Sequence, residues 1–144
     1  MKKVKEIKEV KPKIITISGK RKTAIAKATI KAGTGHVRVN KKPIELYPLF
    51  QKLTLLEPLR IADDILKEDK FDIEVNVKGG GVESQAEAAR LSIAKALVAF
   101  TKSSELRSAF LAYDRSLLVA DVRRKEMYKP GDSKARASRQ KSYR

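Results

Sequence analysis

Cysteine is absent from this 144-residue sequence, and histidine occurs only once. Without cysteine the chain has neither a disulfide framework nor a thiolate metal site, which fits a protein of the reducing cytosol. His36 cannot form a zinc site by itself. No apolar run approaches the roughly 18–20 residues of a membrane span, and the first ten residues, MKKVKEIKEV, lack the apolar core of a signal peptide. We therefore expect no metal, no cofactor and no membrane partner.

Positive charge, in contrast, is abundant and unevenly distributed. The formal net charge is +16. Residues 1–31 contain eleven basic and two acidic side chains, residues 32–122 contain thirteen of each, and residues 123–144 contain nine basic and two acidic ones. A neutral body with two basic ends is typical of a protein that folds by itself and uses its arms electrostatically. The favoured partner of such arms is a nucleic acid, and the alternatives are an anionic membrane and an acidic protein. The membrane is less favoured, because neither end forms an amphipathic helix with bulky apolar anchors.

The carboxyl-terminal stretch from Arg123 to Arg144 reads RRKEMYKPGDSKARASRQKSYR. It has too few apolar side chains to offset the entropy of ordering, so alone it is expected to be disordered. Fully extended, its 22 residues reach about 70–80 Å, enough to cross several RNA helices. Tyr128 and Tyr143 can stack on unpaired bases or pack on ribose. We predict a flexible basic leader at 1–13, a globular domain at 14–122 and an extended basic tail at 123–144.

Between the two ends, periodicity predicts an α+β fold of two layers, with helices on a mostly antiparallel sheet. The clearest strand is Phe71–Lys78, where apolar and polar residues alternate strictly. Further strands are expected at Ile14–Ile17, Thr23–Ala32 and residues 36–40, with short extended pieces at Ile44–Tyr47 and Leu117–Val119. Helices are expected at Pro48–Leu66 in two parts broken at Pro58, from about Glu83 to Phe100, and after Ser103 and Ser104.

Gly79-Gly80-Gly81 follow the clearest strand and precede a helix. A strand, three glycines and a helix N-terminus can form an anion site, which makes a nucleotide-binding enzyme one alternative function. The same glycines also suit a tight strand-to-helix turn, and no catalytic base or magnesium-ligand pattern accompanies them. The string Ser18–Thr23 lacks the full phosphate-loop pattern GxxxxGK[ST]. We therefore predict no catalytic residues and no small-molecule substrate.

Four strings resemble one known family. They are GKRKTAIAKATIKAGTGHVRVN at Gly19–Asn40, KGGG at Lys78–Gly81 with QAEAAR at 85–90, LLVADVRRKE at 117–126, and RQKSYR at 139–144. Together they are similar to signatures of the small-subunit ribosomal protein family called S-nine in bacteria and S-sixteen in eukaryotes, in its archaeal–eukaryotic form. The resemblance covers about residues 14–144.

This resemblance implies an α+β fold, also found in some small-molecule kinases, with an unusual left-handed βαβ crossover. Periodicity cannot give that handedness, and the general rule predicts the opposite one. The resemblance also implies a place in the head of the small subunit of the cytoplasmic ribosome, beside neighbouring head proteins and in contact with small-subunit rRNA. It further implies that the tail approaches the P-site tRNA. The tRNA-proximal residues would then be Lys141, Ser142, Tyr143 and Arg144.

The chain is thus expected to bind rRNA without catalysing a reaction. Lysine and arginine neutralise phosphates and release counterions, and the planar fork of arginine allows bidentate contact. A nucleic-acid-binding protein outside the ribosome is the remaining alternative. The predicted rRNA-binding residues are Lys20, Arg21, Lys22, Arg38, Arg123, Arg124, Lys125, Lys129, Lys134, Arg136 and Arg139.

Overall fold

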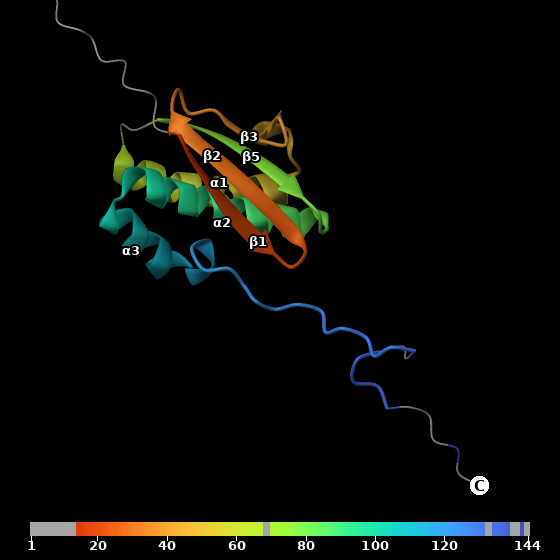
Figure 1. Cartoon of the computed structure of the whole chain (residues 1–144). Coiled ribbons are helices and arrows are strands. Elements are labelled where there is room, and N and C mark those ends of the chain that lie inside the picture. Colours follow the sequence, from red (N-terminus) through yellow and green to blue (C-terminus); the bar gives the residue numbers. More distant parts are fainter. Residues whose placement is uncertain (1–13, 68–69, 132–133, 139–141, 143–144) are drawn as a thin grey trace, which may run out of the picture.

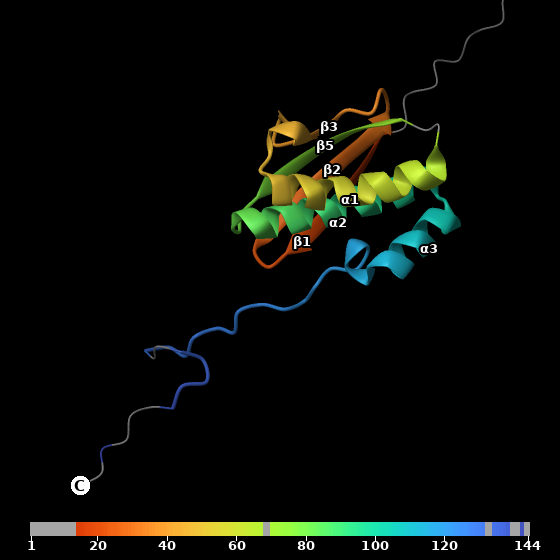
Figure 2. The same ribbon diagram turned by 180° about the vertical axis from the view of Figure 1, so that it is seen from behind.

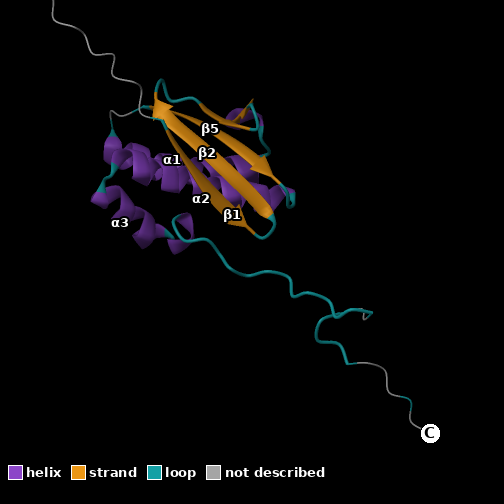
Figure 3. Cartoon of the chain, viewed as in Figure 1, coloured by secondary structure: helices purple, strands orange, loops and turns teal. Residues whose placement is uncertain are grey.

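The computed structural model describes residues 14–67, 70–131, 134–138 and 142. Its body is a five-stranded sheet with helices on one face, and the tail leads away from one end of the body (Figures 1 and 3). The strands are β1 (Ile15–Arg21), β2 (Ala24–Ala32), β3 (Val37–Val39), β4 (Lys42–Pro43) and β5 (Phe71–Lys78). The helices are α1 (Leu49–Leu66), α2 (Val82–Thr101) and α3 (Ser104–Tyr113), with short 3-10 helices η1 (Ile44–Leu46) and η2 (Arg115–Leu117).

The sheet has the strand order β1-β2-β5-β3-β4. The pairs β1–β2, β2–β5 and β3–β4 are antiparallel, and only the pair β3–β5 is parallel. The predicted α+β architecture with a mostly antiparallel sheet is therefore confirmed. The parallel pair requires a crossover, because two parallel neighbours cannot be joined by a tight hairpin.

The crossover from β3 to β5 runs through β4, η1 and α1. Figure 2 shows the helices in front of the sheet. Viewed from this side with β3 and β5 pointing upward, β5 lies to the left of β3, so the crossover is left-handed. Most βαβ units have the opposite hand. The handedness that the family resemblance implied is the one observed.

Small residues bring α2 close to the sheet. Ala24, Ala26 and Ala28 on β2 are fully buried beneath α2, followed by the larger Ile30. On β1, a Cβ atom at Gly19 would lie 2.5 Å from the Ala88 carbonyl oxygen of α2, so only glycine fits there. The alternation predicted for β2 and β5 is thus confirmed: one side of each strand is buried beneath the helices, and the other side faces outward.

Pro58 does not break its helix, contrary to the sequence-based expectation. α1 continues through it from Leu49 to Leu66. Proline removes one backbone hydrogen bond, but the Pro58 ring is fully buried. Burial of the apolar ring offsets part of the free energy lost with that hydrogen bond. The cost of proline within a helix is therefore not enough to break α1 at Pro58.

Several short elements also differ from expectation. Leu117–Val119 is not a strand: Asp114 caps η2 by accepting a hydrogen bond from the Ser116 N–H, and Leu117 is then fully buried. Ile44–Leu46 is a 3-10 helix instead of an extended piece. β1 continues to Arg21, beyond the predicted end at Ile17, so only Lys22 and Thr23 form the turn into β2. In the described part of the chain, no helix has the length and apolar character needed to cross a membrane.

Candidate nucleic-acid interface

The turn between β1 and β2 presents its basic residues in different directions. Lys20 and Lys22 are exposed, and Lys22 occupies the tip of the turn with a φ of 51°. Arg21 shares the helix-facing side of β1 with Gly19, and its side chain is only 17% exposed. The alternation of the strand therefore separates three consecutive cations into two that face solvent and one that faces the body.

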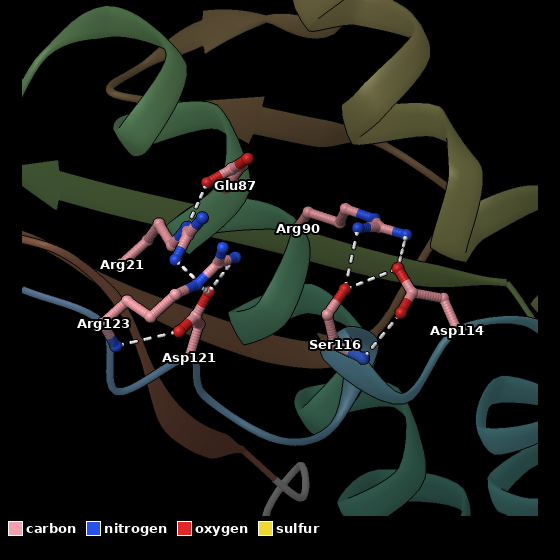
Figure 4. Close-up of polar contacts among 7 residues, drawn as sticks. All are labelled: Arg21, Glu87, Arg90, Asp114, Ser116, Asp121 and Arg123. Atoms are coloured by element: carbon pink, nitrogen blue, oxygen red, sulfur yellow. Dashed lines mark hydrogen bonds and ion pairs between the residues drawn. The ribbon is translucent and has the colours of Figure 1, made fainter.

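Arg21 joins three distant parts of the chain. Its guanidinium donates to Glu87 on α2 and to Asp121, two residues before the start of the tail (Figure 4). Asp121 Oδ2 also accepts from Arg123 at 2.7 Å from Nε, and its Oδ1 accepts from the Arg123 backbone N–H at 2.8 Å. The start of the tail is thus fixed to the end of β1 by two arginines and two carboxylates.

These contacts alter the protonation equilibria of the cluster. The Arg123 side chain and backbone N–H, together with Arg21, hold the pKa of Asp121 well below its usual range. The hydrogen bond to Glu87 raises the pKa of the Arg21 guanidinium. Asp121, Arg21 and Arg123 are therefore charged at neutral pH, and their attraction holds the start of the tail against the end of β1.

A groove of about 680 Å³ lies between the turn and the attached tail. It is lined by Arg21, Lys22 and Thr23 from the turn and by Arg123, Arg124 and Lys125 from the tail. Residues about a hundred positions apart in the sequence thus form a single basic surface. Two of its arginines are paired with acids, Arg21 with Glu87 and Asp121 and Arg123 with Asp121, whereas Lys22, Arg124 and Lys125 form no ion pair with any described residue. We call these six lining residues the tail groove.

A second arginine cluster holds the helices behind this groove. Arg90 on α2 forms an ion pair with Asp114 before η2 and donates to the Ser116 hydroxyl (Figure 4). It also forms an ion pair with Glu57 on α1. Arg90 Nε lies 2.5 Å from Glu57 Oε2 but outside hydrogen-bond geometry. Burial alone would raise the pKa of Asp114, but hydrogen bonds from Ser116 and Arg90 lower it overall. Periodicity gave no signal for this cluster, because its members belong to three elements.

The Gly79–Gly81 turn packs against the same hairpin. Gly79 and Gly80 have φ values of 75° and 69°, which favour glycine. A Cβ atom at Gly79 would lie 2.8 Å from the Thr23 carbonyl oxygen, and one at Gly80 would lie 2.8 Å from the Ala24 Cβ. Close packing of the strand-to-helix turn against the hairpin therefore explains why positions 79 and 80 are glycine. Among the described residues, no group of three or more His, Asp or Glu side chains is arranged to hold a metal ion.

Comparison with known proteins identifies the family. Residues 19–144 match the family model described as ribosomal protein S9/S16. This chain belongs to the ribosomal protein S9/S16 family. It is 50% identical over 135 residues to small ribosomal subunit protein uS9 of Methanococcus maripaludis strain C5, covering 92% of this chain and 99% of the relative. The identity and both coverages are the same for uS9 of Methanococcus vannielii. The archaeal form inferred from the sequence strings is therefore confirmed.

Within this S9/S16 chain, the other predicted rRNA-binding residues lie on two separate surfaces. Arg38 is exposed on β3, in a hollow that also includes His36, Asp72 and Glu74. Further along the tail, Lys129 and Lys134 are exposed and Arg136 pairs with Glu126 at 2.8 Å. The structure thus brings Arg21, Lys22 and Arg123–Lys125 together and leaves Arg38 apart.

Tail residues beyond the groove are only partly described. Lys125 Nζ lies 4.5 Å from the centre of the Tyr128 ring, a cation–π contact within the tail itself. Ser142 is exposed. The leader at 1–13 lies outside the described residues, and so do Arg139, Lys141, Tyr143 and Arg144, so their predicted contacts stay predictions.

Proposed function

We propose that this S9/S16 chain is a non-catalytic structural constituent of the small ribosomal subunit, located in the head beside neighbouring head proteins in cytoplasmic ribosomes. In this proposal the tail groove and the tail bind small-subunit rRNA, and the tip of the tail reaches the P-site tRNA. The observation that carries the proposal is the tail groove, in which a hairpin turn and the tail exit combine their cations. Family membership supports the ribosomal setting, because the uS9 relatives are small-subunit proteins by name.

The physics of the groove suits a phosphate backbone. Lys22, Arg124 and Lys125 are exposed and form no ion pair within the described chain. Each can neutralise a phosphate and release counterions, which gives strong, salt-dependent and largely sequence-independent affinity. Arg21 and Arg123 have an additional role, because their pairing with Asp121 sets the direction in which the tail leaves the body. The exposed tail can then follow RNA without a core of its own.

The role of the tail tip can be separated from that of the rest of the tail by two double variants with equal charge loss. K141Q/R144Q should leave assembly into small subunits intact and weaken retention of P-site tRNA by about three- to tenfold, since two charged contacts are lost. K129Q/K134Q should leave tRNA retention unchanged. Filter binding of tRNA to purified subunits measures both. Equal tRNA retention by wild type and K141Q/R144Q would count against the proposed reach of the tail.

Assembly itself is tested by sedimentation. The chain should remain on small subunits in stoichiometric amount after a moderate salt wash. Recovery of the chain only as a free pool would contradict the ribosomal setting and favour a nucleic-acid-binding protein outside the ribosome. Nucleotide binding by the isolated chain at micromolar concentration would instead support an enzyme that uses the Gly79–Gly81 turn.

A further inference from the structure

The face of the sheet turned away from the helices carries a second group of cations. Figure 1 views the sheet from this side, with the helices behind it. The outward residues of β1 are Thr16, Ser18 and Lys20, because Ile15, Ile17 and Gly19 are directed toward α2. On β2 and β5 the outward residues include Ile25, Lys27 and Lys78. Lys27 and Lys78 are absent from the rRNA-binding residues that the sequence predicted.

Strand register brings these residues into one cluster. Ile25 pairs directly with Lys20 on β1 and with Lys78 on β5, so the two lysines flank it on either side. Lys27 lies on the same face of β2, two residues further along, between Ser18 and Asn76. Direct cross-strand partners have Cβ atoms about 4.5–5.5 Å apart, well within the reach of a lysine side chain. We call Lys20, Ile25, Lys27 and Lys78 the open-face cluster.

The cluster has charge of one sign only. All three lysines are exposed, and none of them pairs with a carboxylate in the described chain. Two acids share this face. Glu74 lies opposite Thr29, diagonal to Lys27, and forms no ion pair with it. Asp72 accepts backbone N–H groups from Thr34 and His36 and lies 4.0 Å from Lys31. Three neighbouring lysines without a carboxylate partner generate a local positive potential that attracts a polyanion.

An apolar side chain occupies the centre of the cluster. Ile25 is 45% exposed, on the face of β2 turned away from the helices and one residue pair from the β1–β2 turn. A small isolated apolar group of this kind can pack on a ribose or a base face while the surrounding ammonium groups contact phosphates.

We infer that the open-face cluster is a second RNA-contacting surface, which binds a stretch of phosphate backbone independently of the tail. This inference rests on the proposed rRNA-binding function and extends it to residues on the opposite side of the hairpin. The tip at Lys22 lies between the two surfaces, because it lines the tail groove and directly follows the end of β1. RNA that follows the tail to the hairpin therefore meets a continuous basic surface that extends onto the open face. This basic surface ends at the acids Glu74 and Asp72 on β5.

The test compares two double variants of the full chain with equal charge loss. K27Q/K78Q removes two lysines of the open-face cluster, and K31Q/K70Q removes two exposed lysines at the far end of the sheet. Binding to transcribed small-subunit rRNA is measured over a range of salt concentrations. K27Q/K78Q should weaken binding about tenfold near physiological salt. It should also reduce the magnitude of the negative slope of log K against log salt by about 1.5, as for two lost phosphate contacts. K31Q/K70Q should change both values much less. Equal effects of the two pairs would overturn the inference.

A third pair keeps this inference distinct from the proposed function. R124Q/K125Q should weaken rRNA binding through the tail groove. If the wild type binds rRNA no better than an unrelated RNA of equal length, the proposed function fails and this inference fails with it. If the wild type binds and R124Q/K125Q weakens binding, but K27Q/K78Q behaves like its control, only the open-face inference fails. Unchanged thermal unfolding of all the pairs, followed by circular dichroism, confirms that each variant is folded.

Chemical protection identifies the occupant. Acetylation of lysine amines, read by mass spectrometry, should be slower at Lys27 and Lys78 when rRNA alone is added, while Lys31 and Lys70 stay reactive. Protection of Lys27 and Lys78 that appears only after other subunit proteins are added would mean that an acidic protein covers this face, and it would overturn the RNA inference.

Discussion

At the scale of single residues, the close approach of β1 to α2 depends on the absence of a side chain at Gly19. A Cβ atom at Gly19 would lie 2.5 Å from the Ala88 carbonyl oxygen and 2.7 Å from the Ser92 nitrogen, both backbone atoms of α2. Backbone atoms within a helix cannot move individually, so a larger residue must push α2 away from β1. The neighbouring alanines of β2 would then lose contact with the helix as well.

Gly19→Ser should therefore lower the free energy of unfolding by about 1–3 kcal/mol, as expected for overpacking of a tight interface. Gly81→Ser is the matched control. No heavy atom lies within 4 Å of a Cβ at Gly81, its φ is −91°, and serine is a favoured residue at a helix N-cap. Denaturant unfolding of both variants measures the difference. A loss of similar size at Gly81 would show that the close contact with α2 is not the cause.

Asp121 predicts a pH dependence. Its folded pKa lies below the unfolded value of about 3.9. The stability it contributes is therefore fully present above the unfolded pKa and is lost as the pH falls through the folded pKa. Asp121→Asn should lower the Tm at neutral pH, and the difference from wild type should narrow steadily below about pH 4.

The control for this experiment is Asp64→Asn, which removes an exposed α1 carboxylate that forms no ion pair with a described residue. Its Tm should follow that of the wild type across the same pH range. A constant Tm difference between wild type and Asp121→Asn from pH 2.5 to 7 would contradict the assigned role of the Asp121 charge.

At the scale of elements, the β1–β2 hairpin combines backbone strain with positive charge. A left-handed conformation costs about 1–2 kcal/mol for a residue with a side chain, whereas glycine adopts it freely but loses more entropy on folding. Lys22 and Lys102 both have this conformation, with φ values of 51° and 55°. Lys22 lies at the hairpin tip, and Lys102 caps the C-terminus of α2. The two lysines thus allow strain and RNA binding to be separated.

Lys22→Gly should raise the free energy of unfolding by about 0.5–1 kcal/mol, because relief of strain exceeds the added entropy cost. The same variant should lower the salt slope of rRNA binding by about 0.7–0.9, as for one lost phosphate contact. Lys102→Gly should stabilise the chain to a similar extent and leave rRNA binding unchanged. Parallel denaturation and binding titrations check both variants. Unaltered binding by Lys22→Gly would contradict a functional reason for lysine at the tip.

At the scale of the whole molecule, the apolar core and the basic tail are spatially separated. The apolar core lies between the sheet and the helices, and every described residue from Val122 to Gly131 is exposed. The β1–β2 turn, the end of β5 and the tail exit lie toward the same end of the body (Figures 1 and 2). The protein thus has a basic end that is separate from its apolar core.

Removal of residues 126–144 should therefore leave the Tm within about 2 °C of the full chain, since no described residue of that segment contributes a buried apolar side chain. The same deletion removes six cations and should reduce the salt slope of rRNA binding by up to about 4–5. A full-length variant with those six residues changed to Gln is the control, and it should match the deletion in both respects. A large fall in Tm would show that the tail helps to hold the body together.

Much of the element pattern follows from local sequence. Strict alternation at Phe71–Lys78 predicted β5, and alternation at Thr23–Ala32 predicted the two faces of β2, because side chains of a strand point to opposite sides in turn. Pro58 and Leu117–Val119 were predicted wrongly for one reason. Burial of the Pro58 ring and of Leu117 in the core outweighed local preferences that a sequence window can detect.

The sequence by itself determined the charge distribution, the main strands and helices, and the family, since each depends on residue type and short spacing. Only the tertiary structure decided the left-handed crossover and the directions in which the cations of the β1–β2 hairpin point. Arg21 looks equivalent to Lys20 and Lys22 in the sequence, but β1 continues to Arg21 and turns it inward toward Glu87 and Asp121. Lys20 points outward instead, beside Ile25 and on the same face as Lys78. The partners of these cations lie far away along the chain, and local periodicity carries no information about contacts across that distance.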